Sequence, residues 1–128
     1  NTFGNFCSIR FRIFKDNLIL LKLSSLDFSF MVEQNISKIF KELHDSKMKV
    51  DVIQNSAISF SVCFFDKYGN LNDLISRLEG KFKIEINKNV SLFTIRHFDE
   101  KSIKKISHKR KLLLEQRTEK TVRLIFSN

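Results

Sequence analysis

Apolar residues that alternate with polar ones predict several strands along the chain. Within residues 17–25, Ile19, Leu21 and Leu23 fall on one face, because successive side chains of a strand point to opposite faces. The same alternation predicts further strands at 6–14, 50–53, 58–64, 82–86, 91–98, 112–117 and 121–126. The chain is therefore expected to be rich in short strands.

Apolar residues three and four positions apart predict three helices between these strands. The first helix has one apolar face, formed by Val32, Ile36, Ile39, Phe40 and Leu43. A short second helix repeats this spacing in Leu71, Leu74, Ile75 and Leu78. It is expected to end near Gly80, because glycine readily takes the left-handed conformation that follows many helices. A third helix is predicted at 100–107, where Ile103 and Ile106 are the apolar positions.

The order of these elements predicts two related units. Residues 17–88 follow the order β-α-β-β-α-β of ferredoxin-like folds, and the residues from 91 onward repeat β-α-β-β and stop. An unfinished sheet exposes an edge, so the remaining strand at 6–14 is expected to complete the second unit. We therefore predict an α+β fold in which the first ferredoxin-like unit is inserted into a degenerate second one.

The apolar segment 50–65 (VDVIQNSAISFSVCFF) predicts a deeply buried hairpin, with Ile58 on the core face of its second strand. A polar cluster interrupts this segment. Gln54, Asn55 and Ser56 separate two predicted strands, and Asp51 lies near the start of the segment. One interpretation is a plain turn, since Asn and Ser favour turns, with Asp51 exposed to water. The other is a site for a free amino acid, whose ammonium needs an anion and whose carboxylate needs N–H or O–H donors. The residues alone leave both interpretations open.

Composition narrows the class of protein. With 128 residues, 42% of them apolar and 29% charged, the chain is expected to fold as one domain or two very small ones. No apolar run is long enough to span a bilayer and no signal pattern opens the chain, so we expect a cytoplasmic protein without membrane contact. The chain begins at Asn1 rather than at a methionine, which indicates a piece of a longer protein.

The net charge of +9 is typical of proteins that bind nucleic acid. It includes one local basic run, formed by Lys101, Lys104, Lys105, Lys109, Arg110 and Lys111. Such a run is also typical of a solvated helix face in a chain that favours lysine throughout. We adopt the second interpretation.

Residues that could carry catalysis or bind metal are scattered. Cys7 and Cys63 lie in apolar strands without CxxC spacing, and are expected to be buried thiols rather than metal ligands. The three histidines are far apart in the sequence, at positions 44, 97 and 108, and the glycines at 4, 69 and 80 cannot form a phosphate loop. We therefore expect no catalytic site, no cofactor and no metal in this chain.

The element order and two segments resemble a known family. Val50-Asp51-Val52-Ile53, followed by Gln54-Asn55-Ser56 and the alternating strand 58–62, is similar to the first of the paired ACT domains at the C-terminus of aspartokinases. The segment 112–117 (LLLEQR) resembles a strand of the second ACT domain. On this resemblance, ACT domain 1 covers 15–88, and a degenerate ACT domain 2 combines 1–14 with 89–128.

The resemblance implies a binding site and a function. In the family this stretch runs through an amino-acid effector site, which would here comprise Val50, Asp51, Gln54, Asn55, Ser56 and Met31. The effector would be lysine or threonine, acting by feedback inhibition in aspartate-family amino-acid biosynthesis, and ACT domain 1 would form a homodimer. An upstream kinase domain of the parent aspartate kinase would bind ATP and Mg and phosphorylate aspartate.

Two departures from the family keep alternatives open. The loop 24–35 lacks the family's glycine, and Ala57 stands where lysine-responsive members often carry an acid. The chain could therefore be a degenerate ACT pair that only dimerises. An RNA-binding module of the RRM type shares the topology, but no basic-Gly-aromatic run precedes the aromatic residues of 58–65, so we expect no nucleic-acid partner.

Overall fold

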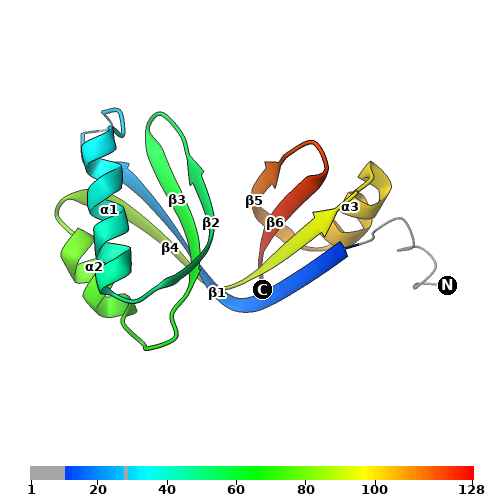
Figure 1. Ribbon diagram of the computed structural model, residues 1–128, viewed down its shortest axis with the longest axis horizontal. Helices are drawn as coiled ribbons and strands as arrows, with labels where there is room; N and C mark the ends of the chain where they lie inside the picture. Colours follow the sequence, from blue (N-terminus) through cyan, green and yellow to red (C-terminus); the bar gives the residue numbers. More distant parts are fainter. Residues whose placement is uncertain (1–10, 28) are drawn as a thin grey trace. The chain divides into compact units, whose positions relative to one another are not determined.

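The computed structural model of the chain describes residues 11–27 and 29–128. Their elements follow in the order β1 (Phe11–Ser25), α1 (Glu33–Asp45), β2 (Lys49–Asn55), β3 (Ser59–Phe65), α2 (Leu71–Leu78), β4 (Phe82–Arg96), α3 (Glu100–Ser107), β5 (Lys111–Arg117) and β6 (Thr121–Ser127) (Figure 1). The chain forms two compact units. The first unit is Leu18–Lys88, and the second unit is Asn89–Asn128 together with the chain up to Asn17.

Strands β1 and β4 each contribute to both units. The sequence predicted separate strands at 6–14 and 17–25, and again at 82–86 and 91–98, but the described residues form one continuous strand in each case. Asn17 and Asn89, which lie at the two boundaries between the units, have positive φ angles of 56° and 54°. Asparagine tolerates this conformation, so the strand changes direction locally without ending. Residues 6–10, with Cys7, lie outside the described residues.

The first unit has the predicted β-α-β-β-α-β order. Its strands lie in the order β2-β3-β1-β4, with β3 antiparallel to β2 and to β1. Helices α1 and α2 cover one face of this sheet (Figure 1). The core between helices and sheet is built from fully buried side chains that include Leu21, Leu23, Ile39, Leu74 and Phe60. The predicted α+β class is confirmed.

Two details of the first unit differ from the sequence-based expectation. The hairpin of β2 and β3 was expected to be deeply buried, but β2 is the end strand of the sheet and most of its side chains are exposed or half-buried. Ile58 was expected on the core face of β3, but it lies in the turn before that strand and is 53% exposed. An edge strand has one neighbour instead of two, so alternation alone overstated its burial.

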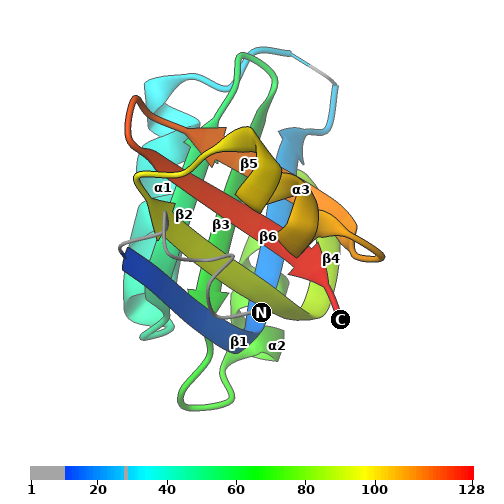
Figure 2. The same cartoon turned by 90° about the vertical axis from the view of Figure 1, so that its right-hand side faces the viewer.

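The second unit has a smaller core. Strands β4 and β5 flank β6 and are both antiparallel to it, and α3 lies across this sheet (Figure 2). Buried side chains from β4, α3 and β6 meet there, namely Phe93, Ile95, Ile103, Ile106, Val122, Leu124 and Phe126. The ring of Phe14 in β1 packs on Phe93 with 4.8 Å between centroids, so the described end of β1 joins this core.

Leu74 provides a test of the core of the first unit. Leu74→Ala removes a side chain that is completely buried and should lower the free energy of unfolding by about 2–5 kcal/mol. Urea denaturation followed by circular dichroism measures the change. Asn72→Ala, at an exposed position of the same helix, is the matched control and should change stability by less than about 0.5 kcal/mol. Equal midpoints for the two variants would contradict the core described above.

Candidate functional site

Asp51 occupies a special position in strand β2. In the pairing of β2 with β3, Val50 lies opposite Phe64 and Val52 opposite Cys63, so Asp51 is the extra residue of a β-bulge. A bulge bends the strand, re-aims the side chain of the extra residue and is common beside functional sites. The side chain of Asp51 is half-buried. The structure therefore presents this acid at a distortion of an edge strand, which the sequence pattern did not reveal.

The polar cluster covers the end of β2 and the first residue of the hairpin turn, Ser56. The Ser56 N–H donates to the carbonyl oxygen of Ser59 at 2.9 Å, and the two hydroxyl oxygens lie 2.8 Å apart. Ser56 therefore forms the turn through its backbone and its hydroxyl group. Asn55 lies opposite Phe60 and Gln54 opposite Ser61 in the strand register, so their side chains belong to different faces of the sheet. The predicted site residues of β2 do not all point the same way.

Met31 connects the loop before α1 to this turn. Its backbone N–H donates to the carbonyl oxygen of Ala57 at 2.8 Å, and its side chain is buried in the core of the first unit. The structure thus places Met31 beside the turn that follows Asn55 and Ser56. Val50 lies further along β2, on the helix-covered face, where it packs against the same core.

Side chains order the loop that lacks glycine. The Ser25 hydroxyl donates to the carbonyl oxygen of Ser29 at 2.7 Å, and the Ser29 N–H donates to Asp27 Oδ1 at 3.1 Å. Hydrogen bonds from the side chain and then the backbone of Ser29 lower the pKa of the Asp27 carboxyl. Sequence reasoning missed these three residues, although a Ser-x-Asp-x-Ser spacing is a signal of local side-chain to backbone bonding.

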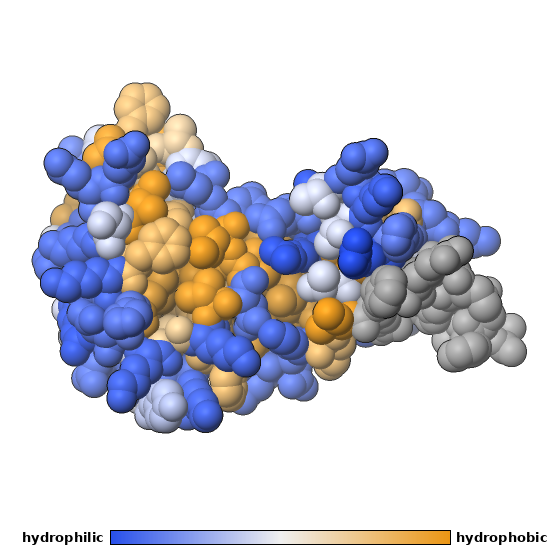
Figure 3. Space-filling model, viewed as in Figure 1, coloured by the Kyte–Doolittle hydropathy of each residue, from blue (hydrophilic) through white to orange (hydrophobic). Residues whose placement is uncertain are grey.

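Apolar side chains are exposed along α1 and β2. Val32 and Phe40 on α1, and Ile53 on β2, are all more than a third exposed. Figure 3 shows an apolar area over this part of the first unit, bordered by hydrophilic residues. Phe40 also contacts the buried ring of Phe60 edge-on at 5.5 Å, which fixes the position of its exposed side. A contiguous apolar area with a polar border is typical of an interaction surface.

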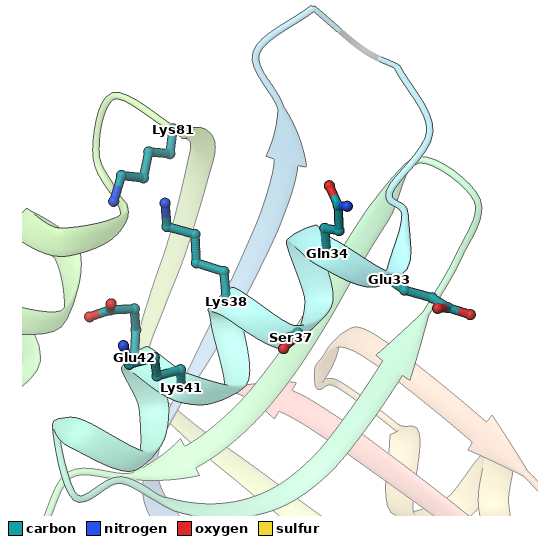
Figure 4. Close-up of a pocket in the computed structure, with 7 residues that line it drawn as sticks. All are labelled: Glu33, Gln34, Ser37, Lys38, Lys41, Glu42 and Lys81. Atoms are coloured by element: carbon teal, nitrogen blue, oxygen red, sulfur yellow. The ribbon is translucent and has the colours of Figure 1, made fainter.

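A wide polar groove of about 660 Å³ lies elsewhere on the first unit, along α1. Its lining is formed by Glu33, Gln34, Ser37, Lys38, Lys41, Glu42 and Lys81. The side chains of Lys38 and Lys81 point toward one another across it (Figure 4). Hydrogen bonding to Lys81 lowers the pKa of Lys38, and desolvation and the charge of Lys81 act in the same direction. Two close ammonium groups make this groove unfavourable for a cationic ligand.

The basic run around α3 is partly structural. The guanidinium of Arg110 lies 4.8 Å from the centroid of Phe93 and 5.8 Å from that of Phe126, which is a stacked cation–π arrangement. The large rings that an RRM-like protein would present to RNA are buried here, with Phe60 and Phe64 in the first core. The five lysines of the run are exposed.

Residues 11–27 and 29–128 contain neither a metal-binding cluster nor a membrane-spanning helix. Within these ranges no three His, Cys, Asp or Glu side chains are grouped closely enough to bind a metal ion. None of the three helices described is long and apolar enough to cross a membrane. Cys63 is buried, as predicted.

The fold is similar to that of aspartate kinases of known structure. E. coli aspartokinase III, solved with lysine and aspartate in the T-state, matches with a TM-score of 0.69 and 17% identity over 92% of this chain and 29% of that chain. Aspartate kinase from Clostridium acetobutylicum matches with a TM-score of 0.74 and 16% identity over 93% and 31%, respectively. The regulatory subunit of aspartate kinase from Thermus flavus matches with a TM-score of 0.66 and 11% identity over 93% and 88%.

These matches establish the fold of the chain. They also show that this fold makes up only part of the whole kinases but most of the regulatory subunit. This chain spans less than a third of the two whole kinases but most of the regulatory subunit. No protein-family model matches the chain, and no curated protein has a significantly similar sequence. The likeness is therefore structural, at identities that sequence comparison does not detect.

Lys81 allows a test of the two facing ammonium groups. Lys81→Gln should raise the melting temperature near pH 7, where both lysines are charged and repel each other only in the folded state. As the pH rises through the lowered pKa of Lys38, the melting temperature of wild type should approach that of Lys81→Gln. The reason is that Lys38 loses its proton at a lower pH in the folded state than in the unfolded state, which stabilises the folded state. Differential scanning calorimetry between pH 7 and alkaline pH measures both effects.

Lys88→Gln is the matched control for this test. It removes the same charge from an exposed position of β4 in the same unit. If both variants change the melting temperature equally at every pH, the effect is one of net charge and the close contact between Lys38 and Lys81 is absent.

Proposed function

We propose that this chain is a regulatory region of an aspartokinase, composed of two ACT domains at 15–88 and at 1–14 with 89–128, and that it binds an end-product amino acid. The observation that carries this proposal is the match to a regulatory subunit over 93% of this chain and 88% of that chain. The presence of lysine and aspartate in the E. coli T-state structure supports an amino-acid ligand. The kinase domain, with ATP and Mg, would lie upstream in the parent protein.

The proposed effector site runs along β2, from its bulge to the hairpin turn that meets the loop before α1. Asp51 lies about 13 Å of strand before Asn55 and would supply the anion that an ammonium group requires. Asn55 and Ser56 supply amide and hydroxyl donors for a carboxylate. The Met31 to Ala57 hydrogen bond holds the two loops at a fixed distance, so the site is preorganised.

The effector proposed is lysine or threonine. Both share the ammonium and carboxylate that these residues would recognise, and they differ in the side chain. Binding would inhibit the kinase only if the ligand prefers one quaternary arrangement over another, because a ligand with equal affinity for both states shifts no equilibrium. A conformational change between subunits therefore belongs to the proposal.

A homodimer through the first unit is the proposed assembly. The exposed apolar side chains Val32, Phe40 and Ile53 lie beside β2, the end strand of the sheet. A second copy would cover this apolar area and the free edge of the sheet together. A chain that dimerises in this way but binds no amino acid is the second candidate, favoured by the loop 24–35 that lacks the family's glycine.

Asp51→Asn tests the effector site. The substitution keeps the size of the side chain and removes the charge that would pair with the ammonium. Loss of a charged hydrogen bond costs about 1.5–3 kcal/mol, so affinity should fall about tenfold to hundredfold. Isothermal titration calorimetry with lysine and with threonine measures the change, and in the parent kinase the same variant should relieve inhibition and retain uninhibited turnover.

Asp45→Asn is the control for Asp51→Asn. It makes the same chemical change at an exposed residue at the C-terminal end of α1 that is not one of the proposed site residues. Its affinity for the effector should equal that of wild type. The effector site is refuted if neither amino acid binds wild type, or if Asp51→Asn binds as well as Asp45→Asn does; the dimer-only candidate then remains.

Ile53→Lys tests the dimer. The side chain of Ile53 is 37% exposed on β2, and a buried lysine without a partner would disrupt an interface there. Ile86→Lys is a closely matched control, because Ile86 is 38% exposed on β4. Light scattering should show a dimer for wild type and Ile86→Lys, and a monomer for Ile53→Lys. A monomeric wild type would contradict the proposed assembly.

A further inference from the structure

The two hairpins of the chain are structural repeats. In each hairpin, two seven-residue strands are joined by a turn of the same length: β2 with β3, and β5 with β6. The bulge between Val50 and Val52 recurs between Leu112 and Leu114, at the equivalent position. The turns also match, because the Thr118 N–H donates to the carbonyl oxygen of Thr121 at 2.8 Å as Ser56 does to Ser59.

Equivalent residues of the two hairpins can be compared one by one, and some of them differ in charge. The bulge residue is Asp51 in the first hairpin and Leu113 in the second, so the second hairpin has no acid there. Gln54 and Gln116 are equivalent and identical. Ser61, which lies opposite Gln54, is replaced by Arg123, which lies opposite Gln116. The second hairpin therefore has no anion at its bulge, and it has a cation at the position equivalent to Ser61.

These substitutions surround a small pocket in the second unit. Gln116, Thr118, Thr121 and Arg123 line a cavity of about 180 Å³. Arg123 Nη1 donates to Gln116 Oε1 at 3.5 Å, and the Thr118 hydroxyl donates to the carbonyl oxygen of Thr121 at 3.3 Å. Gln116, Thr121 and Arg123 are half-buried. The guanidinium is thus held in place by a side chain that also lines the pocket.

The charges around the pocket are positive. In the pairing of β4 with β6, Thr94 lies opposite Arg123 and Arg96 opposite Thr121, so a second guanidinium belongs to the same face of this sheet. The acid of the neighbouring strand, Glu115, lies opposite Leu124 of the core and therefore belongs to the other face. There Glu115 accepts a hydrogen bond from Arg117 at 2.9 Å, and Arg117 also pairs with Glu100 of α3.

We propose that this pocket binds a small oxyanion, that is, a carboxylate or phosphate group of a ligand. A guanidinium offers a planar fork of donors that matches two oxygens of such a group, and the Thr121 hydroxyl and the Gln116 amide add further donors. The cavity has a volume of about 180 Å³. This is several times the ~30 Å³ that one water molecule occupies in the liquid, so the cavity has room for such a group. The second unit would then recognise the group of opposite charge to the one bound by Asp51.

The test is a titration of the whole 128-residue chain with inorganic phosphate in one arm and acetate in the other. Nuclear magnetic resonance follows the side-chain N–H signals of Arg123 and Gln116 and the backbone amide of Thr121, at ionic strength held constant with sodium chloride. At least one of the two anions should shift these signals saturably. The arm that saturates at lower concentration distinguishes a phosphate site from a carboxylate site, and either result supports the proposal.

Variants decide whether the shifts arise from the pocket. Arg123→Gln should weaken binding about tenfold to hundredfold. Lys101→Gln, which removes the same charge from an exposed position of α3, should leave the affinity unchanged. Arg123→Lys keeps the charge without the fork and should bind with intermediate affinity, which covers the case in which Arg123→Gln fails to fold. Equal losses for Arg123→Gln and Lys101→Gln, or shifts by chloride alone, would overturn the proposal. None of these outcomes depends on whether Asp51 binds an amino acid.

Discussion

The continuity of β1 and β4 is the constraint on which the rest of the structure depends. Each strand is 15 residues long and supplies part of the sheet in both units, so neither unit could bury its core without them. The chain keeps both strands continuous through single asparagines in a left-handed conformation, Asn17 and Asn89. Because strands β2, β3, β5 and β6 then pair outward from β1 and β4, both hairpins stand at the ends of the strand order.

Because the hairpins lie at the ends of the strand order, their side chains can be substituted with little effect on the core. A central strand packs on both sides and tolerates few substitutions, whereas an edge strand with a bulge can change the side chain at the bulge at little cost to the core. The two hairpins illustrate this with Asp51 in one and Leu113 in the other, on the same backbone pairing. The same backbone pairing therefore carries different side chains in the two units.

Much of the fold was predictable because its signals are local. Leu71, Leu74 and Leu78 follow helical spacing, and the helix ends just before Gly80, whose φ is 85°. The β-bulge at Asp51 was not predictable, because the shift in register depends on the partner strand and leaves no trace in the alternation of β2 itself. For the same reason the sequence could not show that Gln54 and Asn55 belong to different faces.

The candidate site was predictable only in part. Turn chemistry identified Ser56, and the resemblance to a family brought Met31 to the same end of the unit, where its hydrogen bond to Ala57 is observed. The side-chain bonds of Ser25, Asp27 and Ser29 were not predicted, because they depend on the conformation of the loop as well as on its residue types. The exposure of Ile58 was missed because alternation continues by chance into the turn.

Because Cys63 is completely buried, its reaction with a thiol reagent can report how often the first hairpin opens. This residue is central in β3, between β2 and β1, and none of its surface is accessible. A thiol reagent can therefore react with it only after β3 has separated from its neighbours. In a Cys7→Ser background, the rate of modification would report how often the first hairpin opens. A ligand that clamps the hairpin turn to the loop before α1 would slow that rate in proportion to its occupancy.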